Sequence, residues 1–198
     1  METIASAARE LAAIEIAAVL LALAYLVLVI RQNILCWLAA LVSTALYLNI
    51  FVAAGLFMEA ALQLFYGAMA VYGWYRWRTG ERGSERLPIR TWSTRQHGLA
   101  VAGIIALTTA AGAALSFTPA ALPFADSFTT IGALVATYMV AQKILENWLY
   151  WFVIDSVSIY LYVSRDLWLT ALLFVLYLML IVVGYRRWRA DYRSQEGA

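Results

Sequence analysis

The chain has 198 residues, of which 64% are hydrophobic and 13% are charged, whereas soluble domains are about 45–50% apolar and about 25% charged. A single soluble core could not bury that much apolar surface, so the composition excludes an ordinary soluble domain and predicts an integral membrane protein. The net charge of +2 excludes nothing by itself, and the single Cys36 excludes only an internal disulfide.

Seven apolar segments have the length of about 17–25 residues that a membrane-spanning helix requires. The first segment follows Glu2, Arg9 and Glu10 and lacks the basic start and the cleavage site of a secretory signal, so we expect it to remain as a helix. The predicted helices cover residues 11–30, 35–53, 58–77, 98–117, 127–144, 146–164 and 167–187.

The basic residues are distributed unevenly between the two sides of these seven spans. Only Arg9 and Arg165 fall on one side, and the other side has twelve: Arg31, Arg76, Arg78, Arg82, Arg86, Arg90, Arg95, Lys143, Arg186, Arg187, Arg189 and Arg193. By the positive-inside rule, this split predicts an outer N-terminus and a cytoplasmic C-terminus. A nucleic-acid or anionic-lipid patch is the alternative, but membrane topology explains every member of the cluster.

The sequence contains an internal repeat at an offset of 111 residues (184 − 73 = 111). Gly73-Trp74-Tyr75-Arg76-Trp77-Arg78 aligns with Gly184-Tyr185-Arg186-Arg187-Trp188-Arg189, and the same offset superimposes Trp37 on Trp148. We therefore expect a first triple-helix repeat (11–77), a basic loop (78–97), a connector helix (98–117), a second triple-helix repeat (127–188) and a tail (189–198). Parallel repeats occur in transporters with substrate near the midplane, although any duplicated membrane protein would show one.

Polar side chains at membrane depth are costly, so each is a candidate functional residue. Helical spacing places Asn147, Trp151, Asp155 and Ser158 on one face of the sixth predicted helix. Asp155 could neutralise a substrate cation, carry a proton, or only bond a neighbouring helix.

Further polar and aromatic candidates lie on the second, third and fifth predicted helices. They are Thr44, Tyr47, Glu59, Gln63, Tyr66, Trp74, Tyr138 and Gln142. Aromatic faces can stack on a cationic ring, and amides supply both donors and acceptors, so the set suits a flat, nitrogen-containing small molecule. For any single Ser or Thr, hydrogen bonding within the helix packing is the favoured alternative. Trp77 and Trp188, near cytoplasmic helix ends, are expected to be interface anchors.

No catalytic constellation is present in the sequence. It has no phosphate-binding GxxxxGK[ST] loop and no HExxH motif. Its only histidine, His97, is predicted to lie in a loop that has no other typical metal ligands at a suitable spacing. We therefore expect no catalytic residues, no metal, no cofactor and no enzyme activity.

Three segments resemble the PnuC family of bacterial vitamin transporters. They are Arg31-Gln32-Asn33-Ile34-Leu35-Cys36-Trp37, the stretch from Gln63 to Trp77, and Glu146-Asn147-Trp148-Leu149-Tyr150-Trp151 with Asp155. The resemblance implies a SWEET-like fold of two parallel triple-helix bundles joined by a connector helix (3+1+3), and a homotrimer in the bacterial inner membrane. It points to Asn147 and Trp151 as substrate contacts, facing Gln63, Tyr66 and Trp74, with Trp37 and Trp148 as a gate or an anchor.

The resemblance also implies uptake of nicotinamide riboside by facilitated diffusion, with a cytoplasmic kinase trapping the product. Thiamine is the alternative substrate, because short members of the family include thiamine transporters and both vitamins present a ring cation. Two other classes remain open: a substrate-binding subunit that requires a separate ATPase, and a structural or signalling seven-helix protein. Beyond the vitamin and the lipid bilayer, no nucleic-acid partner is expected.

Overall fold

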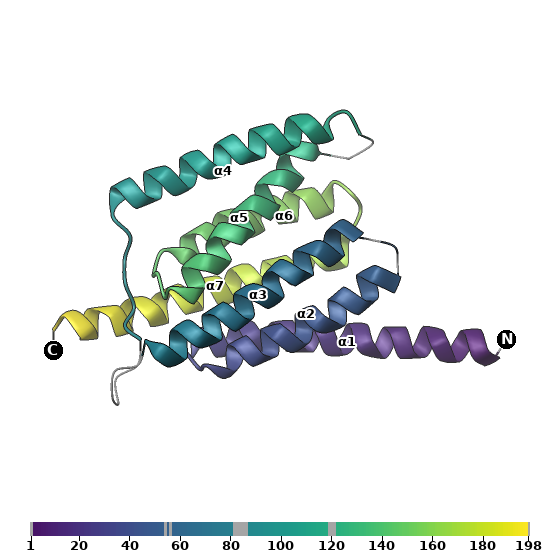
Figure 1. The fold of residues 1–198 in the computed structure, drawn as a ribbon, viewed down its shortest axis with the longest axis horizontal. Helices are drawn as coiled ribbons and strands as arrows, with labels where there is room; N and C mark the ends of the chain where they lie inside the picture. The colour runs from purple at the N-terminus through teal and green to yellow at the C-terminus, as the bar shows by residue number, and fades with distance from the viewer. Residues whose placement is uncertain (1, 54, 56, 81–86, 119–121, 198) are drawn as a thin grey trace. The chain divides into compact units, whose positions relative to one another are not determined.

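The computed structural model describes residues 2–53, 55, 57–80, 87–118 and 122–197. This part of the chain is helical apart from one isolated bridge between Arg90 and Ile144. Its seven helices are α1 (Glu2–Ile30), α2 (Leu35–Ala53), α3 (Phe57–Thr79), α4 (Thr94–Leu115), α5 (Pro123–Ala141), α6 (Asn147–Val163) and α7 (Trp168–Glu196). Figure 1 shows the seven helices as coiled ribbons in chain order from purple to yellow.

The chain forms two compact units, Met1–Leu87 and Pro88–Ala198. In the first unit, α2 packs against both α1 and α3. At one end of this unit the Trp37 ring meets the edge of Trp77 at 5.5 Å between centroids and 87°. Tyr25 of α1 lies 6.1 Å from the Trp37 ring, so a cluster of large aromatic rings joins the three helices.

In the second unit, α6 packs against both α5 and α7, and α4 packs against α5. Small buried residues on α5, among them Gly132, Ala133 and Ala136, let α5 and α6 approach closely. A Cβ atom on Gly132 would lie 2.9 Å from the Ile154 side chain of α6. Figure 1 shows α4 (teal) lying alongside α5 within this unit.

The repeat predicted from the sequence has a counterpart in the local geometry of the two units. Positive φ angles occur at Gln32 (52°) and Lys143 (53°), and again at Gly55 (71°) and Asp166 (58°); both pairs are separated by 111 residues (143 − 32; 166 − 55). The edge contact between Trp37 and Trp77 recurs between Trp148 and Trp188, at 5.5 Å and 88°. The two turns and the pair of tryptophans therefore have the same local geometry in both repeats.

Four predicted helix ends were wrong by four residues or more. The first helix begins at Glu2 and not at 11, and the fifth begins at Pro123 and not at 127. The other two errors, in α4 and α7, have local causes. The fourth helix begins at Thr94, four residues earlier than expected, because Ser93 and Gln96 form a reciprocal capping box. His97 therefore lies in the first turn of α4 and not in a loop. The last helix continues to Glu196, past the expected end at 187, because Arg, Ala, Gln and Glu are strong helix formers after the apolar stretch ends.

Four helices in the described part of the chain are long and apolar enough to span a membrane: Leu35–Ala53, Thr94–Leu115, Pro123–Ala141 and Trp168–Glu196. A shorter apolar helical stretch covers Ile16–Ile30. The 17 residues of α6 include the buried Asp155, and α3 carries Arg76 and Arg78 in its last turn. Several apolar helices of this length indicate a multi-pass membrane protein.

Candidate functional site

The strongest candidate site is the buried polar face of α6. Asn147 begins this helix and is 0% exposed. Its side-chain Nδ2 donates to the Ile144 carbonyl at 2.6 Å, while its Oδ1 has no hydrogen-bond partner among the described residues. A buried acceptor without a donor costs about 1–3 kcal/mol, so this oxygen is suited to receive a donor from a bound molecule.

The positioning of Asn147 follows from the turn before it. Lys143 adopts a positive φ of 53°, and the Ile144 N–H donates to the Met139 carbonyl at 2.9 Å, which closes the end of α5. The Ile144 carbonyl then accepts from the Asn147 N–H at 3.2 Å as well as from its side chain. The Ile144 carbonyl thus holds both the backbone and the side-chain amide of Asn147, and the Oδ1 atom is left without a donor in the described part of the structure.

Two more predicted residues lie on the buried face of α6. Asp155 is 4% exposed, and no hydrogen bond or ion pair to it is found within the described ranges. Ser158, also buried, donates its hydroxyl to the Ile154 carbonyl at 3.0 Å. Trp151 is half-buried, one turn from Asn147. A carboxylate, an amide oxygen and an indole on one face can receive a cationic ring that carries donors.

The predicted residues of α5 are placed differently from the buried face of α6. Tyr138 is exposed on α5, and the half-buried Gln142 is the C-cap of that helix. The buried polar residues of α5 are instead Ser127 and Thr137, and the Ser127 hydroxyl has no partner in the described part of the chain. The sequence prediction missed Ser127, because a Ser in an apolar helix gives no signal beyond its polarity.

The predicted residues of the first unit lie on α2 and α3. Thr44 is half-buried and donates to the Leu41 carbonyl of its own helix at 3.0 Å. Tyr47 stacks on Phe51 at 5.7 Å, and Tyr66 meets the edge of Phe65 at 5.8 Å. Gln63 and Trp74 are half-buried on α3. The side chain of Glu59 lies outside the described residues.

The paired tryptophans Trp37 and Trp148 are buried against glycines. A Cβ atom on Gly73 would overlap the Trp37 ring, and a Cβ atom on Gly184 would overlap the Trp148 ring. The predicted interface anchors Trp77 and Trp188 are buried as well. That prediction was wrong, because their rings fill the space beside Trp37 and Trp148.

A second polar cluster was not predicted from the sequence. The segment Pro88–Trp92, here called the strap, lies across the turn between α5 and α6. The Arg90 N–H donates to the Lys143 carbonyl at 2.9 Å, and the Leu145 N–H donates to the Arg90 carbonyl at 2.8 Å. The Trp92 N–H donates to Glu146 Oε2 at 3.3 Å. The strap therefore holds the turn that positions Asn147.

His97 extends this cluster from the first turn of α4. Its Nδ1 lies 3.0 Å from the Tyr150 hydroxyl, and its Nε2 lies 4.0 Å from Glu146 Oε1. Its ring stacks on Tyr150 at 5.8 Å and 26°. The Ser-x-x-Gln capping signal before His97 would have placed this residue on a helix. No group of three potential metal ligands occurs among the residues that the structure describes.

These features define a multi-pass helical membrane protein with a polar, aromatic site buried among its helices. The model of the nicotinamide mononucleotide transporter family matches residues 12–190. The chain therefore belongs to this family of vitamin transporters, which includes PnuC.

Individual relatives agree with this assignment. The chain is 25% identical over 175 residues to the nicotinamide riboside transporter PnuC of Escherichia coli, covering 75% of this chain and 73% of that protein. It is 30% identical over 129 residues to the riboflavin/roseoflavin transporter RibM of Streptomyces davaonensis, covering 61% of this chain and 59% of that protein.

A solved structure has a similar fold. The crystal structure of the vitamin B3 transporter PnuC superimposes with a TM-score of 0.70 at 25% sequence identity, covering 90% of this chain and 81% of that one.

Proposed function

We propose that this protein transports nicotinamide riboside across the bacterial inner membrane by facilitated diffusion through seven spans in 3+1+3 order. A cytoplasmic kinase would trap the substrate by phosphorylation, and the protein would assemble as a homotrimer. The observation that carries the proposal is the buried, unpaired Oδ1 of Asn147, beside Trp151 and the buried Asp155 on α6. The match to PnuC over 75% of the chain supports the choice of substrate.

The chemistry of nicotinamide riboside complements these three residues. Its carboxamide N–H can donate to Asn147 Oδ1, its pyridinium ring can stack on Trp151, and the carboxylate of Asp155 can offset the ring charge. Further proposed substrate contacts are Gln63, Tyr66 and Trp74 of α3, Thr44 and Tyr47 of α2, and Tyr138 and Gln142 of the second unit. Trp37 and Trp148 are proposed to act as a gate or an anchor.

Riboflavin is a second candidate substrate, favoured by the 30% identity to RibM. Its flavin ring is uncharged at neutral pH, whereas the rings of nicotinamide riboside and thiamine are cations. Asp155→Asn removes the negative charge while keeping the shape of the side chain. This substitution should reduce uptake of a cationic vitamin strongly and uptake of riboflavin little.

Tracer uptake into liposomes that contain only the purified chain tests the proposal. Nicotinamide riboside should equilibrate across the membrane without a proton gradient and without ATP. Asn147→Ala should weaken substrate binding by about 5- to 150-fold, since a desolvated donor would lose its partner. The matched control is Cys36→Ala, at the equivalent position of the first repeat (147 − 36 = 111), where a buried thiol is replaced by a methyl group.

Four outcomes would contradict parts of the proposal. Uptake of riboflavin or thiamine, with none of nicotinamide riboside, would replace the substrate. Accumulation that depends on a proton gradient would replace the uniport mechanism, and uptake that needs an added ATPase would make the chain a subunit of a larger transporter. Unchanged uptake in Asn147→Ala would remove α6 from the site and favour a structural or signalling role.

A further inference from the structure

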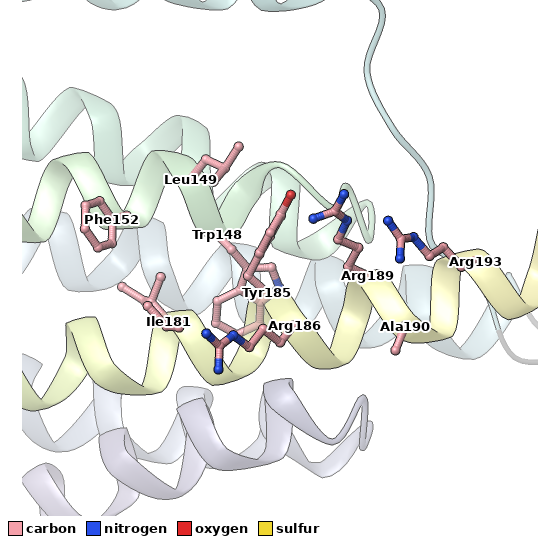
Figure 2. Close-up of a pocket in the computed structure, with 10 residues that line it drawn as sticks. Trp148, Leu149, Phe152, Ile181, Tyr185, Arg186, Arg189, Ala190 and Arg193 are labelled. Carbon is pink, nitrogen blue, oxygen red and sulfur yellow. The ribbon is translucent and has the colours of Figure 1, made fainter.

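A groove of about 460 Å³ lies on the second unit between α6 and α7 and is separate from the buried polar face of α6. Figure 2 shows arginines at one end of it and apolar side chains at the other. It is lined by Trp148, Leu149, Phe152, Ile181, Val182, Tyr185, Arg186, Arg189, Ala190 and Arg193. Its volume falls in the range of pockets that hold small ligands, about 300–1,000 Å³.

The basic end of the groove has a strong positive charge. Arg186, Arg189 and Arg193 line it, and no acidic residue does. None of the three forms a salt bridge within the part of the chain that the structure describes; the Arg189 guanidinium lies 5.9 Å from the centre of the Tyr185 ring. Three guanidinium groups without a carboxylate partner favour an anion, and guanidinium binds phosphate oxygens in a bidentate manner.

The other end of the groove is apolar and open. Leu149, Phe152 and Val182 line it and are 49%, 44% and 38% exposed. From Ile181 to Arg193 the groove follows thirteen residues of α7, which span about 18 Å at the helical rise of 1.5 Å per residue. An occupant that satisfies both ends must carry an anionic head and a long apolar chain.

The geometry points to this groove as a binding site for one anionic phospholipid, whose phosphate is held by Arg186, Arg189 and Arg193. Its acyl chain would lie over Leu149, Phe152 and Val182. Basic pockets between membrane helices bind anionic head groups in this way. The inference does not depend on which vitamin is transported, because the arginine side chains lie on α7 and not on the polar face of α6.

Native mass spectrometry of the purified full-length protein can test the site, with phosphatidylglycerol and phosphatidylcholine as probes. Phosphatidylglycerol should remain bound at lipid concentrations where phosphatidylcholine does not. Each replacement among Arg186→Gln, Arg189→Gln and Arg193→Gln should weaken phosphatidylglycerol binding by about five-fold. Arg187→Gln, which removes the same charge from the same helix outside the groove, should leave binding unchanged.

A second variant covers the case in which the arginine replacements do not fold. Ala190→Glu keeps every arginine but places a carboxylate in the groove, and it should also release phosphatidylglycerol. Equal retention of the two lipids would overturn the inference, as would equal losses in Arg187→Gln and the groove variants. Displacement of the lipid by excess inorganic phosphate would instead assign the arginines to a soluble phosphate ligand.

Discussion

At the scale of single residues, each repeat depends on one glycine that faces a tryptophan. Gly184 lies against Trp148, and Gly73 lies against Trp37, with no room for a methyl group at either position. Trp148 follows Asn147 in the first turn of α6, and the edge of its ring meets Trp188 of α7. The tryptophan thereby joins the two helices next to the unpaired amide oxygen.

Gly184→Ala should destabilise the protein by about 1–3 kcal/mol, because the added methyl group overpacks the contact with Trp148. Thermal unfolding of the purified protein in detergent would show the loss as a lower midpoint. Gly103→Ala is the matched control: its Cβ meets nothing within 4 Å, and alanine has the higher helix propensity, so this variant should be neutral or more stable.

Adding Trp148→Phe tests whether the clash has the proposed cause. A smaller ring leaves space for the methyl group, so the double variant should lose less stability than the sum of the single losses. Additive losses would show that Gly184 matters for a reason other than this contact.

At the residue scale, the sequence singles out side chains that break a pattern. An acid in an apolar helix, and an asparagine in an otherwise aromatic and apolar segment, marked Asp155 and Asn147, and both are buried. The burial of Trp77 and Trp188 was not foreseen, because tryptophans near helix ends are typical of membrane interfaces. Only the packing of α3 on α2, and of α7 on α6, distinguishes a buried tryptophan from one at the membrane interface.

At the scale of elements, the strap links the start of α4 to the turn before α6. Its two backbone hydrogen bonds use the N–H and the carbonyl of Arg90, and the Ile89 N–H donates to Gln195 Oε1 of α7 at 3.2 Å. The backbone of the strap therefore contacts both the α5–α6 turn and the end of α7.

Arg90→Pro should loosen the strap, because proline removes the N–H that bonds the Lys143 carbonyl. We expect faster hydrogen exchange at the Leu145 amide, by about 5- to 150-fold for a loss of about 1–3 kcal/mol. Arg90→Ala is the control, since it removes the charge but keeps both backbone bonds. Equal exchange in the two variants would mean that the guanidinium, and not the main chain, holds the strap.

The ends of the elements show how far sequence reasoning extends. The limits of α2, Leu35–Ala53, were predicted as they are found, because its apolar stretch is bounded by polar residues and a turn. The strap was predicted to be part of a basic loop. Hydrogen bonds between main-chain atoms do not require particular side chains, so the sequence gives no signal for them. The extension of α7 was missed because the prediction used hydropathy. Hydropathy indicates where the membrane-spanning part of a helix ends, and the helix itself can continue into water.

At the scale of the whole molecule, duplication explains both what the repeats share and what they do not. The paired φ angles and tryptophans recur at the offset of 111 residues, so the scaffold has been kept. The polar residues have diverged: Cys36 occupies the position of Asn147, and Thr44 occupies that of Asp155. One repeat therefore presents an amide and a carboxylate where the other presents a thiol and a hydroxyl.

The charge distribution predicts the orientation of the molecule in the membrane. Twelve of the fourteen basic residues lie on one side of the seven proposed spans, which predicts a cytoplasmic C-terminus. In a Cys36→Ala background, Ser116→Cys after α4 should react with a membrane-impermeant maleimide in intact cells. Ser194→Cys, near the end of α7, should react only after permeabilisation. Both serines are exposed, so a reversed labelling pattern would invert the proposed topology, and labelling of both in intact cells would change the number of spans.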